Sequence, residues 1–219
     1  EHQPPELGAS VRVAPGALFI ISQEAKVIDS ARLIEIRWHG RGGQGAVTSA
    51  ELLAQAAISE GKYAHAFPSF GPERRGAPVL AFVRISSEQP IKIRAEIREP
   101  DVIVVLDPGL LPIANVTSGL KPNGIAIINT RKKAEQIRQE FGINWTLATI
   151  DATSIAREIL GVPITNTTMV GAVVRATGVV KLESLLEPLR HRFDRLAERN
   201  INAMKKAYEE TLINNLVKE

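Results

Sequence analysis

The stretch Arg37-Trp38-His39-Gly40-Arg41-Gly42-Gly43-Gln44-Gly45 decides the fold that this chain is expected to adopt. An apolar run, 33–36, leads into it, and residues 46–54 follow with the periodicity of a helix. Strand, glycine-rich turn and helix start therefore lie end to end. Such a turn directs free backbone N–H groups and the positive end of a helix dipole at one point, which predicts an anion-binding site.

Three of these glycines also match the G-x-G-x-x-G spacing of dinucleotide-binding folds. Those folds hold the ribose with an acidic residue at the end of the second strand. The second strand is expected at 62–67, and the residues after it, Pro68-Ser69-Phe70, include no acid. An autonomous dinucleotide-binding oxidoreductase is therefore the less favoured alternative. A structural role, in which the glycines only let strand and helix pack closely, is another.

Composition bounds the class of protein. The chain has 219 residues, 44% apolar and 23% charged, as in ordinary globular proteins. The formal net charge is +3, and no basic run is interleaved with aromatics, so no nucleic-acid partner is expected. No apolar run approaches the length of about 18 residues that a membrane span needs, so a cytoplasmic protein is expected. The absence of cysteine excludes disulfides, a cysteine nucleophile and cysteine-ligated iron–sulfur clusters within this chain.

The rest of the chain alternates between strand and helix patterns. Near-continuous apolar runs at 101–107, 124–129 and 145–150 are typical of strands buried on both faces. Residues 79–85 and 91–93 are expected to form a strand pair. Helices are expected at 45–60, 151–160, 167–178, 181–192 and 194–217.

These repeated units predict an α/β fold of three layers, α/β/α, with a mostly parallel sheet and helices on both faces, Rossmann-like in kind. We expect a single domain at 33–219. Residues 1–32 are expected to be an N-terminal extension that can form a hairpin and is partly disordered.

A second candidate site is the loop 68–78, which three prolines and two glycines stiffen. Glu73, Arg74 and Arg75 lie at its centre. Arginine side chains suit phosphate or carboxylate, and Glu73 can orient them in advance. Because the loop follows the second strand, near the edge where α/β folds bind ligands, we favour a functional role over a solvated charged loop.

A third segment is 161–172. Asn166 or Thr167 is expected to cap the helix that follows, and ligand contact and capping alone are equally supported. Gly171, inside a helical pattern, predicts close packing. The apolar stripe of the last expected helix favours packing on the sheet, with a subunit contact as the alternative.

Together these segments resemble the gamma subunits of the 2-oxoacid:ferredoxin oxidoreductases, especially the pyruvate and 2-oxoisovalerate enzymes. The residues that carry the resemblance are 35–46, 66–68, 70–78, 99–107 and 166–172. The resemblance covers about residues 33–210 in the same order. Residues 1–32 depart from it.

The resemblance implies one subunit of an enzyme that oxidatively decarboxylates a 2-oxoacid, with pyruvate the first candidate, to an acyl-CoA and passes electrons to ferredoxin. It implies alpha, beta and delta subunits as partners, which would carry thiamine diphosphate, Mg and the [4Fe–4S] clusters. In similar enzymes this domain lies over the thiamine site and helps to form the coenzyme A site by moving. The chain alone is then expected to be inactive, with no catalytic residue and no metal ligand of its own. The residues expected to contact coenzyme A are Gly40, Arg41, Gly42, Gly43, Gln44, Gly45, Glu73, Arg74, Arg75, Asn166 and Thr167.

Overall fold

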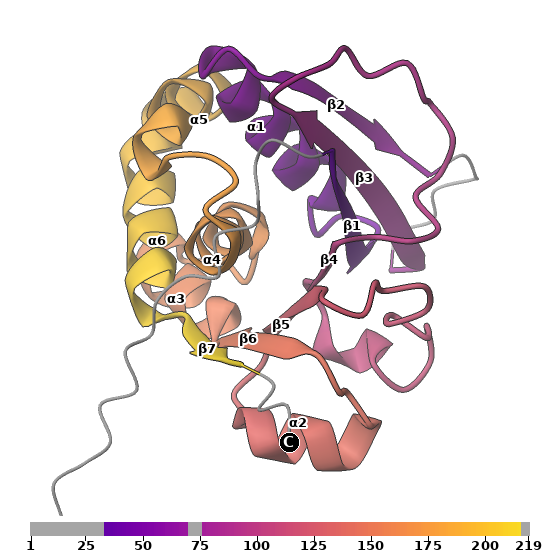
Figure 1. The fold of residues 1–219 in the computed structure, drawn as a ribbon. Helices are drawn as coiled ribbons and strands as arrows, with labels where there is room; N and C mark the ends of the chain where they lie inside the picture. Colours follow the sequence, from indigo (N-terminus) through magenta and orange to yellow (C-terminus); the bar gives the residue numbers. More distant parts are fainter. Residues whose placement is uncertain (1–32, 70–75, 216–219) are drawn as a thin grey trace, which may run out of the picture.

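The computed structural model describes residues 33–69 and 76–215 (Figure 1). The expected hairpin within 1–32, the central residues Glu73, Arg74 and Arg75 of the second loop, and positions 216–217 of the last expected helix lie outside the described residues. The strands are β1 (Ile34–Arg41), β2 (Tyr63–Pro68), β3 (Pro78–Ser86), β4 (Val102–Val105), β5 (Ile125–Asn129), β6 (Thr146–Ile150) and β7 (Leu212–Asn214).

Six α-helices and three short 3₁₀-helices accompany these strands within the described residues. The α-helices are α1 (Ala46–Ser59), α2 (Ala134–Phe141), α3 (Ala152–Leu160), α4 (Asn166–Thr177), α5 (Leu186–Phe193) and α6 (Ala197–Glu210). The 3₁₀-helices are η1 (Pro108–Leu110), η2 (Leu182–Leu185) and η3 (Asp194–Leu196). The helix expected at 181–192 is thus divided into η2 and α5.

The seven described strands form one sheet in the order β2-β3-β1-β4-β5-β6-β7. Strands β1, β4, β5 and β6 pair in parallel, whereas β3 is antiparallel to both β1 and β2. Strand β2 therefore runs in the direction of β1, and only β3 and β7 run the other way. The mostly parallel sheet is confirmed, and the carboxyl ends of five strands meet at one edge.

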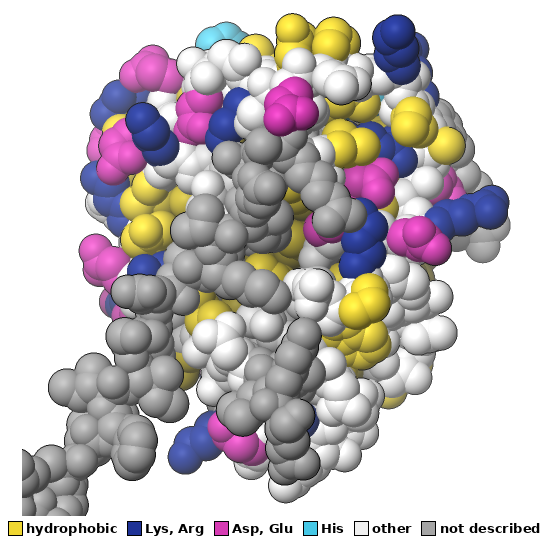
Figure 2. All heavy atoms as spheres, in the orientation of Figure 1, with side chains coloured by type: hydrophobic (Ala, Val, Ile, Leu, Met, Phe, Trp, Pro, Cys, Tyr) yellow, Lys and Arg dark blue, Asp and Glu magenta, His cyan; other side chains and the backbone are white. Residues whose placement is uncertain are grey.

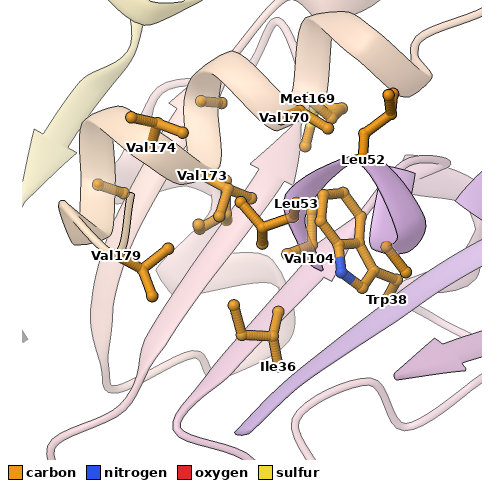
Figure 3. Packing of buried hydrophobic residues seen from close by; sticks show 14 of the residues in the cluster. Ile36, Trp38, Leu52, Leu53, Val104, Met169, Val170, Val173, Val174 and Val179 are labelled. Carbon is orange, nitrogen blue, oxygen red and sulfur yellow. The ribbon is translucent and has the colours of Figure 1, made fainter. Parts of the chain in front are cut away.

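Helices cover both faces of the sheet, which confirms the three-layer arrangement. Helices α1, α4 and α6 lie on one face, and α2 lies on the other (Figure 1). On the first face Trp38 of β1 packs beside Leu53 of α1 and Met169 of α4 (Figure 3). Alternate residues of β4 join opposite cores, Val104 on the first face and Ile103 on the second, so this strand is buried on both sides.

Helices α4 and α6 approach each other closely at Gly171. A Cβ added to Gly171 would lie 2.1 Å from the carbonyl oxygen of Met204, so only glycine fits there. This confirms the expected close packing. The apolar stripe of α6 is buried through Ile201, Met204 and Ala207.

Residues 91–93 do not form a strand, so the expected strand pair is wrong. Strand β3 pairs with β1 from Pro78 to Ile85 and with β2 on its other side from Ala81 to Ser86, so strands already lie along both of its edges. Ile93 instead lies in a segment without regular structure, with 53% of its surface exposed. The apolar residues of this short run therefore gave a misleading strand signal.

The helix expected at 194–217 is also wrong in its bounds. Asp194 has a left-handed backbone, φ 43°, which separates α5 from the short η3 that precedes α6. At the other end α6 stops at Glu210, and Thr211 adopts an extended conformation while its hydroxyl donates to the Ala207 carbonyl. The chain then pairs with β6 as β7. Pairing with an open strand edge has overridden the helical periodicity.

The lengths of the helices and the charges on one face describe the surface of the molecule further. No helix among residues 33–69 and 76–215 is both long enough and apolar enough to cross a bilayer. Acidic and basic side chains are intermixed on the face shown in Figure 2. That face therefore carries mixed charge over the described residues.

Candidate functional site

The glycine-rich turn joins β1 to α1 at the carboxyl edge of the sheet, as the sequence predicts. Gly43 and Gly45 have left-handed backbones, with φ of 92° and 80°. The turn is closed by two hydrogen bonds: the Arg41 N–H donates to Gln44 Oε1 at 2.8 Å, and the Gln44 N–H donates to the Arg41 carbonyl at 2.9 Å. Helix α1 starts directly after it, with no acidic residue in its first turn. Its first N–H groups have no partners within the helix, which favours an anion there.

The third segment of the sequence lies against this turn. The Ser49 hydroxyl of α1 donates to the carbonyl of Asn166, the first residue of α4, at 3.1 Å. A Cβ on Gly45 would stand 2.8 Å from Asn166 Nδ2. The starts of α1 and α4 are therefore side by side, and glycine is required where they meet.

The expected capping role of Asn166 and Thr167 is wrong. Helix α4 includes both residues, and Thr165 occupies the cap position without a side-chain hydrogen bond. Asn166 Oδ1 accepts from the Thr167 N–H at 2.8 Å, while the Thr167 hydroxyl donates to Asn200 Oδ1 of α6 at 2.9 Å. Thr167 is fully buried, so it positions α4 against α6 and offers no surface to a ligand.

Arg41 is held by an acidic residue that the sequence reasoning did not place in the site. Its Nε contacts Asp107 Oδ2 at 2.7 Å, and an Nη atom donates to the Gly76 carbonyl at 3.2 Å. Gln44 Nε2 and the Gly109 N–H also donate to Asp107. Arg41 keeps 30% of its side chain exposed, so part of the side chain still faces solvent.

Asp107 also corrects the argument about the missing acid. The strand that lies beside β1 in parallel is β4, not β2, and Asp107 stands two residues after the end of β4. An acid therefore does stand at the end of the neighbouring strand. Its oxygens already accept from Arg41, Gln44 and the Gly109 N–H. The signal was present in the sequence as an acid directly after a buried apolar run.

The described end of the loop 68–78 contacts the glycine-rich turn, as its place after β2 led us to expect. The Gly42 N–H donates to the Ala77 carbonyl at 2.9 Å, and the Gly76 N–H donates to the Gly42 carbonyl at 3.2 Å. The two candidate segments are thus joined by backbone hydrogen bonds. The structure brings together the turn, the end of this loop and the start of α4.

A pocket of about 430 Å³ opens beside the turn, on the face of the sheet opposite α1. It was not foreseen from the sequence. Arg37, His39 and Gly40 line it from β1, and Leu80 lines it from β3. The far wall is formed by Leu110, Ala114, Asn115 and Ser118. Its polar lining is unusual because it contains a buried arginine next to a buried histidine.

These two side chains form a hydrogen-bonded pair. Arg37 Nε donates to His39 Nε2 at 3.0 Å, and His39 is only 4% exposed. Burial, and then the charge of Arg37, lower the pKa of His39 from 6.5 to about 3. The imidazole is therefore neutral at physiological pH.

The described residues contain no group of three or more histidine, cysteine, aspartate or glutamate side chains placed to hold a metal ion. The whole sequence contains no cysteine. The polar groups gathered at the carboxyl edge are backbone amides, Arg41 with its partners Asp107 and Gln44, and the neutral imidazole of His39 paired with Arg37. This set suits binding of an anion or of a hydrogen-bond acceptor more than it suits redox chemistry.

Comparison with known proteins identifies the family. The family model described as pyruvate ferredoxin/flavodoxin oxidoreductase matches residues 35–210. The common gamma subunit of the pyruvate/ketoisovalerate oxidoreductases of Pyrococcus furiosus is 56% identical over 181 residues, which is 82% of this chain and 97% of that protein.

Two solved structures extend the comparison. The crystal structure of the pyruvate oxidoreductase subunit PORC of Thermotoga maritima has a TM-score of 0.75 at 40% identity, covering 84% of this chain and 99% of that one. The 2-oxoglutarate:ferredoxin oxidoreductase of Magnetococcus marinus, with 2-oxoglutarate, coenzyme A and succinyl-CoA bound, shares the fold with a TM-score of 0.66 at 20% identity. That match covers 81% of this chain and 30% of the longer one. The chain therefore belongs to the pyruvate ferredoxin/flavodoxin oxidoreductase family, as a gamma-type subunit.

Proposed function

We propose that this chain, inactive alone, completes the coenzyme A site of an assembled 2-oxoacid:ferredoxin oxidoreductase and covers its thiamine site. The reaction would be the oxidative decarboxylation of pyruvate, or of a similar 2-oxoacid, to an acyl-CoA. The observation that carries the proposal is the glycine-rich turn at the carboxyl edge of β1. There the start of α1, the exposed part of Arg41 and the end of the 68–78 loop converge.

The phosphates of coenzyme A are the groups that this turn suits. Gly40, Gly42, Gly43 and Gly45 leave no side-chain bulk over the backbone, and the start of α1 favours a negative charge by about 0.3–1 kcal/mol. A charge-assisted hydrogen bond from Arg41 would contribute about 1.5–3 kcal/mol, so the arginine outweighs the dipole. Asp107 reduces the net charge but also fixes the direction in which the guanidinium points.

The remaining site residues have supporting roles in this proposal. Gln44 closes the turn, and Asn166 and Thr167 set the start of α4 against Gly45. Glu73, Arg74 and Arg75 would add charge from the same loop whose end contacts Gly42. Coenzyme A fits the donors present because they are amides and an arginine, the groups that bind phosphate in proteins.

Other chains would supply the redox chemistry. We assign thiamine diphosphate, Mg and the [4Fe–4S] clusters to alpha, beta and delta subunits in the cytoplasm, and ferredoxin would accept electrons from the complex. The Pyrococcus relative is named as a subunit common to the pyruvate and ketoisovalerate enzymes. A shared subunit is consistent with a chain that serves the common substrate, coenzyme A, and leaves the choice of oxoacid to its partners.

The test is kinetic and uses the assembled enzyme. Arg41→Ala should raise the KM for coenzyme A about ten-fold, the effect of losing about 1.4 kcal/mol of binding. The KM for the oxoacid should hardly change, because the oxoacid reacts on thiamine in another chain. Arg41→Lys should restore only part of the loss, since a point charge cannot reproduce the planar fork.

A matched control separates ligand binding from loop anchoring. Asp107→Asn weakens the ion pair but leaves Arg41 in place and removes a negative charge beside the turn. It should leave the KM for coenzyme A unchanged or lower it. If Arg41→Ala leaves the KM for coenzyme A untouched, or if Asp107→Asn raises it equally, Arg41 only anchors the loop and the proposed phosphate site is wrong.

A further inference from the structure

The pocket beside the turn has the size and lining of a small-molecule site. Its volume of about 430 Å³ lies within the range of about 300–1,000 Å³ that such sites occupy. Leu80, Leu110 and Ala114 give it apolar walls, while His39 and Asn115 contribute polar groups. Asn115 also has a left-handed backbone, φ 39°, a conformation that non-glycine residues seldom adopt.

Arg37 cannot itself bind a ligand in this pocket, because its hydrogen-bonding capacity is used. A guanidinium has five N–H donors. One contacts His39, and the others donate to the carbonyls of Ile97, Arg98, Val116 and Ser118. All five N–H groups of Arg37 donate to neutral acceptors. A carboxylate that enters the pocket therefore has no free pair of guanidinium N–H groups to bind.

His39 lines the pocket, and its hydrogen bond with Arg37 determines which ring nitrogen carries the proton. A guanidinium can only donate, so His39 Nε2 must be the acceptor, and the neutral ring carries its proton on Nδ1. Among the described residues no hydrogen-bond partner is found for Nδ1. The donation from Arg37 also polarises the ring, which makes Nδ1–H a stronger donor.

The pocket offers the neutral ring N–H of His39 beside apolar walls, with Asn115, Ser69 and Ser118 as further neutral polar groups, and this lining suits a neutral polar ligand atom. A carboxylate needs several donors or a cation to offset its loss of water, whereas a neutral carbonyl oxygen needs a single hydrogen bond. The rest of the ligand must be mostly aliphatic to match Leu80, Leu110 and Ala114. An aliphatic chain that carries amide carbonyls meets both conditions.

We propose that this pocket binds the amide-bearing arm of coenzyme A, with one amide carbonyl accepting a hydrogen bond from His39 Nδ1. The inference rests on the proposed coenzyme A function and extends it. Gly40 lines the pocket and also begins the glycine-rich turn, so one ligand could place its phosphates at the turn and its arm in the pocket. The described lining residues include both the His39 donor and the apolar walls, so the isolated full-length chain should bind the arm by itself.

The test follows the ring nitrogens of His39 by NMR in the full chain labelled with ¹⁵N-histidine. The chain has four histidines, so the His39 signals are assignable by substitution. The probe is pantetheine, which carries the amides but neither the phosphates nor the nucleotide. Millimolar pantetheine should shift the Nδ1 signal of His39 in a saturable way. No saturable shift overturns the inference, and so does a response to 2-oxobutanoate, a carboxylate probe, without one to pantetheine.

Two variants localise the binding without disturbing the Arg37–His39 pair. Ala114→Leu narrows the pocket from its far wall and should weaken pantetheine binding at least about ten-fold. His65→Gln on β2, outside the pocket, should leave pantetheine binding unchanged. If Ala114→Leu binds pantetheine as the unaltered chain does, the pocket is not the site.

The outcome can be separated from that of the proposed function. Arg41→Ala should not alter pantetheine binding to the free chain, because pantetheine has no phosphate for the turn. If pantetheine fails to bind but Arg41→Ala raises the KM for coenzyme A, only the pocket assignment is wrong. If pantetheine binds and Arg41→Ala leaves that KM unchanged, the phosphate site is wrong and the pocket assignment stands.

Discussion

Alternate residues of β1 carry the polar chemistry of this molecule. Side chains two positions apart point to the same face of a strand, so Arg37, His39 and Arg41 form a row on one face while Trp38 enters the core on the other. Each member of the row has a defined partner. Arg37 contacts His39 and four carbonyls, and Arg41 contacts Asp107. These contacts hold the row in a fixed geometry at the edge of the sheet where we propose that a ligand binds.

The neutral state of His39 predicts a pH dependence of stability. Its folded pKa, about 3, is lower than the ordinary value of 6.5, so the unfolded chain takes up the proton first. The stability from this group is complete above pH 6.5 and is lost as the pH falls towards 3, by about 1.4 kcal/mol per pH unit. Urea unfolding of the unaltered chain between pH 7 and pH 5 should show this loss.

The matched variant for this prediction is His39→Gln, which does not titrate and whose side-chain oxygen can still accept from Arg37. Its free energy of unfolding should depend less on pH over the same interval. Comparing the two chains removes the contribution of the carboxylates. Parallel pH profiles would contradict the assignment of a depressed pKa to His39.

Gly45 should be the least replaceable residue of the turn. Gly45→Ala would meet both an unfavourable φ of 80° and the amide of Asn166 at 2.8 Å. Gly61 has the same φ with nothing within 4 Å, so Gly61→Ala should cost only the backbone term, about 1–2 kcal/mol. Gly45→Ala should cost about 1–3 kcal/mol more from overpacking. Equal midpoints for the two variants in urea would show that Asn166 moves aside freely.

Sequence alone predicted part of this site. The strand, turn and helix around residues 37–45 were evident because their signals are local. The roles of Asp107 and of the Arg37–His39 pair were missed because their contacts join distant parts of the chain: Arg41 and Asp107 are 66 positions apart, and Arg37 and Val116 are 79 apart. No local pattern encodes such pairings. Only the strand order, which sets β4 beside β1, brings them together.

At the scale of elements, α4 is the centre of the first core. It lies between α1 and α6, and nearly all of its residues are buried. Close approach to α6 depends on Gly171 facing the backbone of Met204. Helix α4 also begins against the glycine-rich turn. A displacement of α4 would therefore change both the packing of the core and the geometry of the candidate site.

Gly171→Ala tests this packing. Alanine is favoured over glycine in a helix by about 1 kcal/mol, but its Cβ would stand 2.1 Å from the Met204 carbonyl oxygen. Separating α4 from α6 should cost about 1–3 kcal/mol and outweigh the gain. Thermal and urea unfolding should show net destabilisation. A Tm at or above that of the unaltered chain would mean that the two helices can part without loss.

Thr168→Val, in the same helix, should have the opposite sign. The Thr168 hydroxyl is fully buried and finds no hydrogen-bond partner within the described part of the chain. Valine has nearly the same shape without the polar atom, so the variant should be more stable by about 1 kcal/mol. Destabilisation on urea unfolding would indicate that the hydroxyl has a partner after all.

The sequence predicted best the strands that are buried on both faces, because a continuous apolar run marks them. Strands β4, β5 and β6 are apolar on both sides and were identified by that pattern alone. The bounds of α6 could not be predicted, because the residues after Glu210 have helical periodicity and become a strand only through pairing with β6. The strand prediction for residues 91–93 was wrong for the converse reason. Their sequence has the pattern of a strand, but β1 and β2 already pair with the two edges of β3.

At the scale of the whole molecule, the described residues contain no group of three or more histidine, cysteine, aspartate or glutamate side chains placed to hold a metal ion. We predict that the purified chain folds and shows no oxoacid oxidation. Supplied with pyruvate, coenzyme A, thiamine diphosphate and an electron acceptor, it should give no turnover above the blank, because it contains no cysteine for a cluster. Adding the partner subunits is the positive control, and clear turnover by the chain alone would overturn the subunit assignment.

The strand order has a further consequence, for solubility. A sheet that does not close into a barrel leaves two outer strands, and an open outer strand is a template on which another chain can add and start aggregation. Here the outer strands are β2 and β7. Strand β7 has only three residues, and β2 is preceded by Lys62 and ends at Pro68, which has no N–H to donate. Short length, charge and proline are the features by which natural sheets discourage such addition. The same features should keep this chain dispersed at high concentration before it meets its partners.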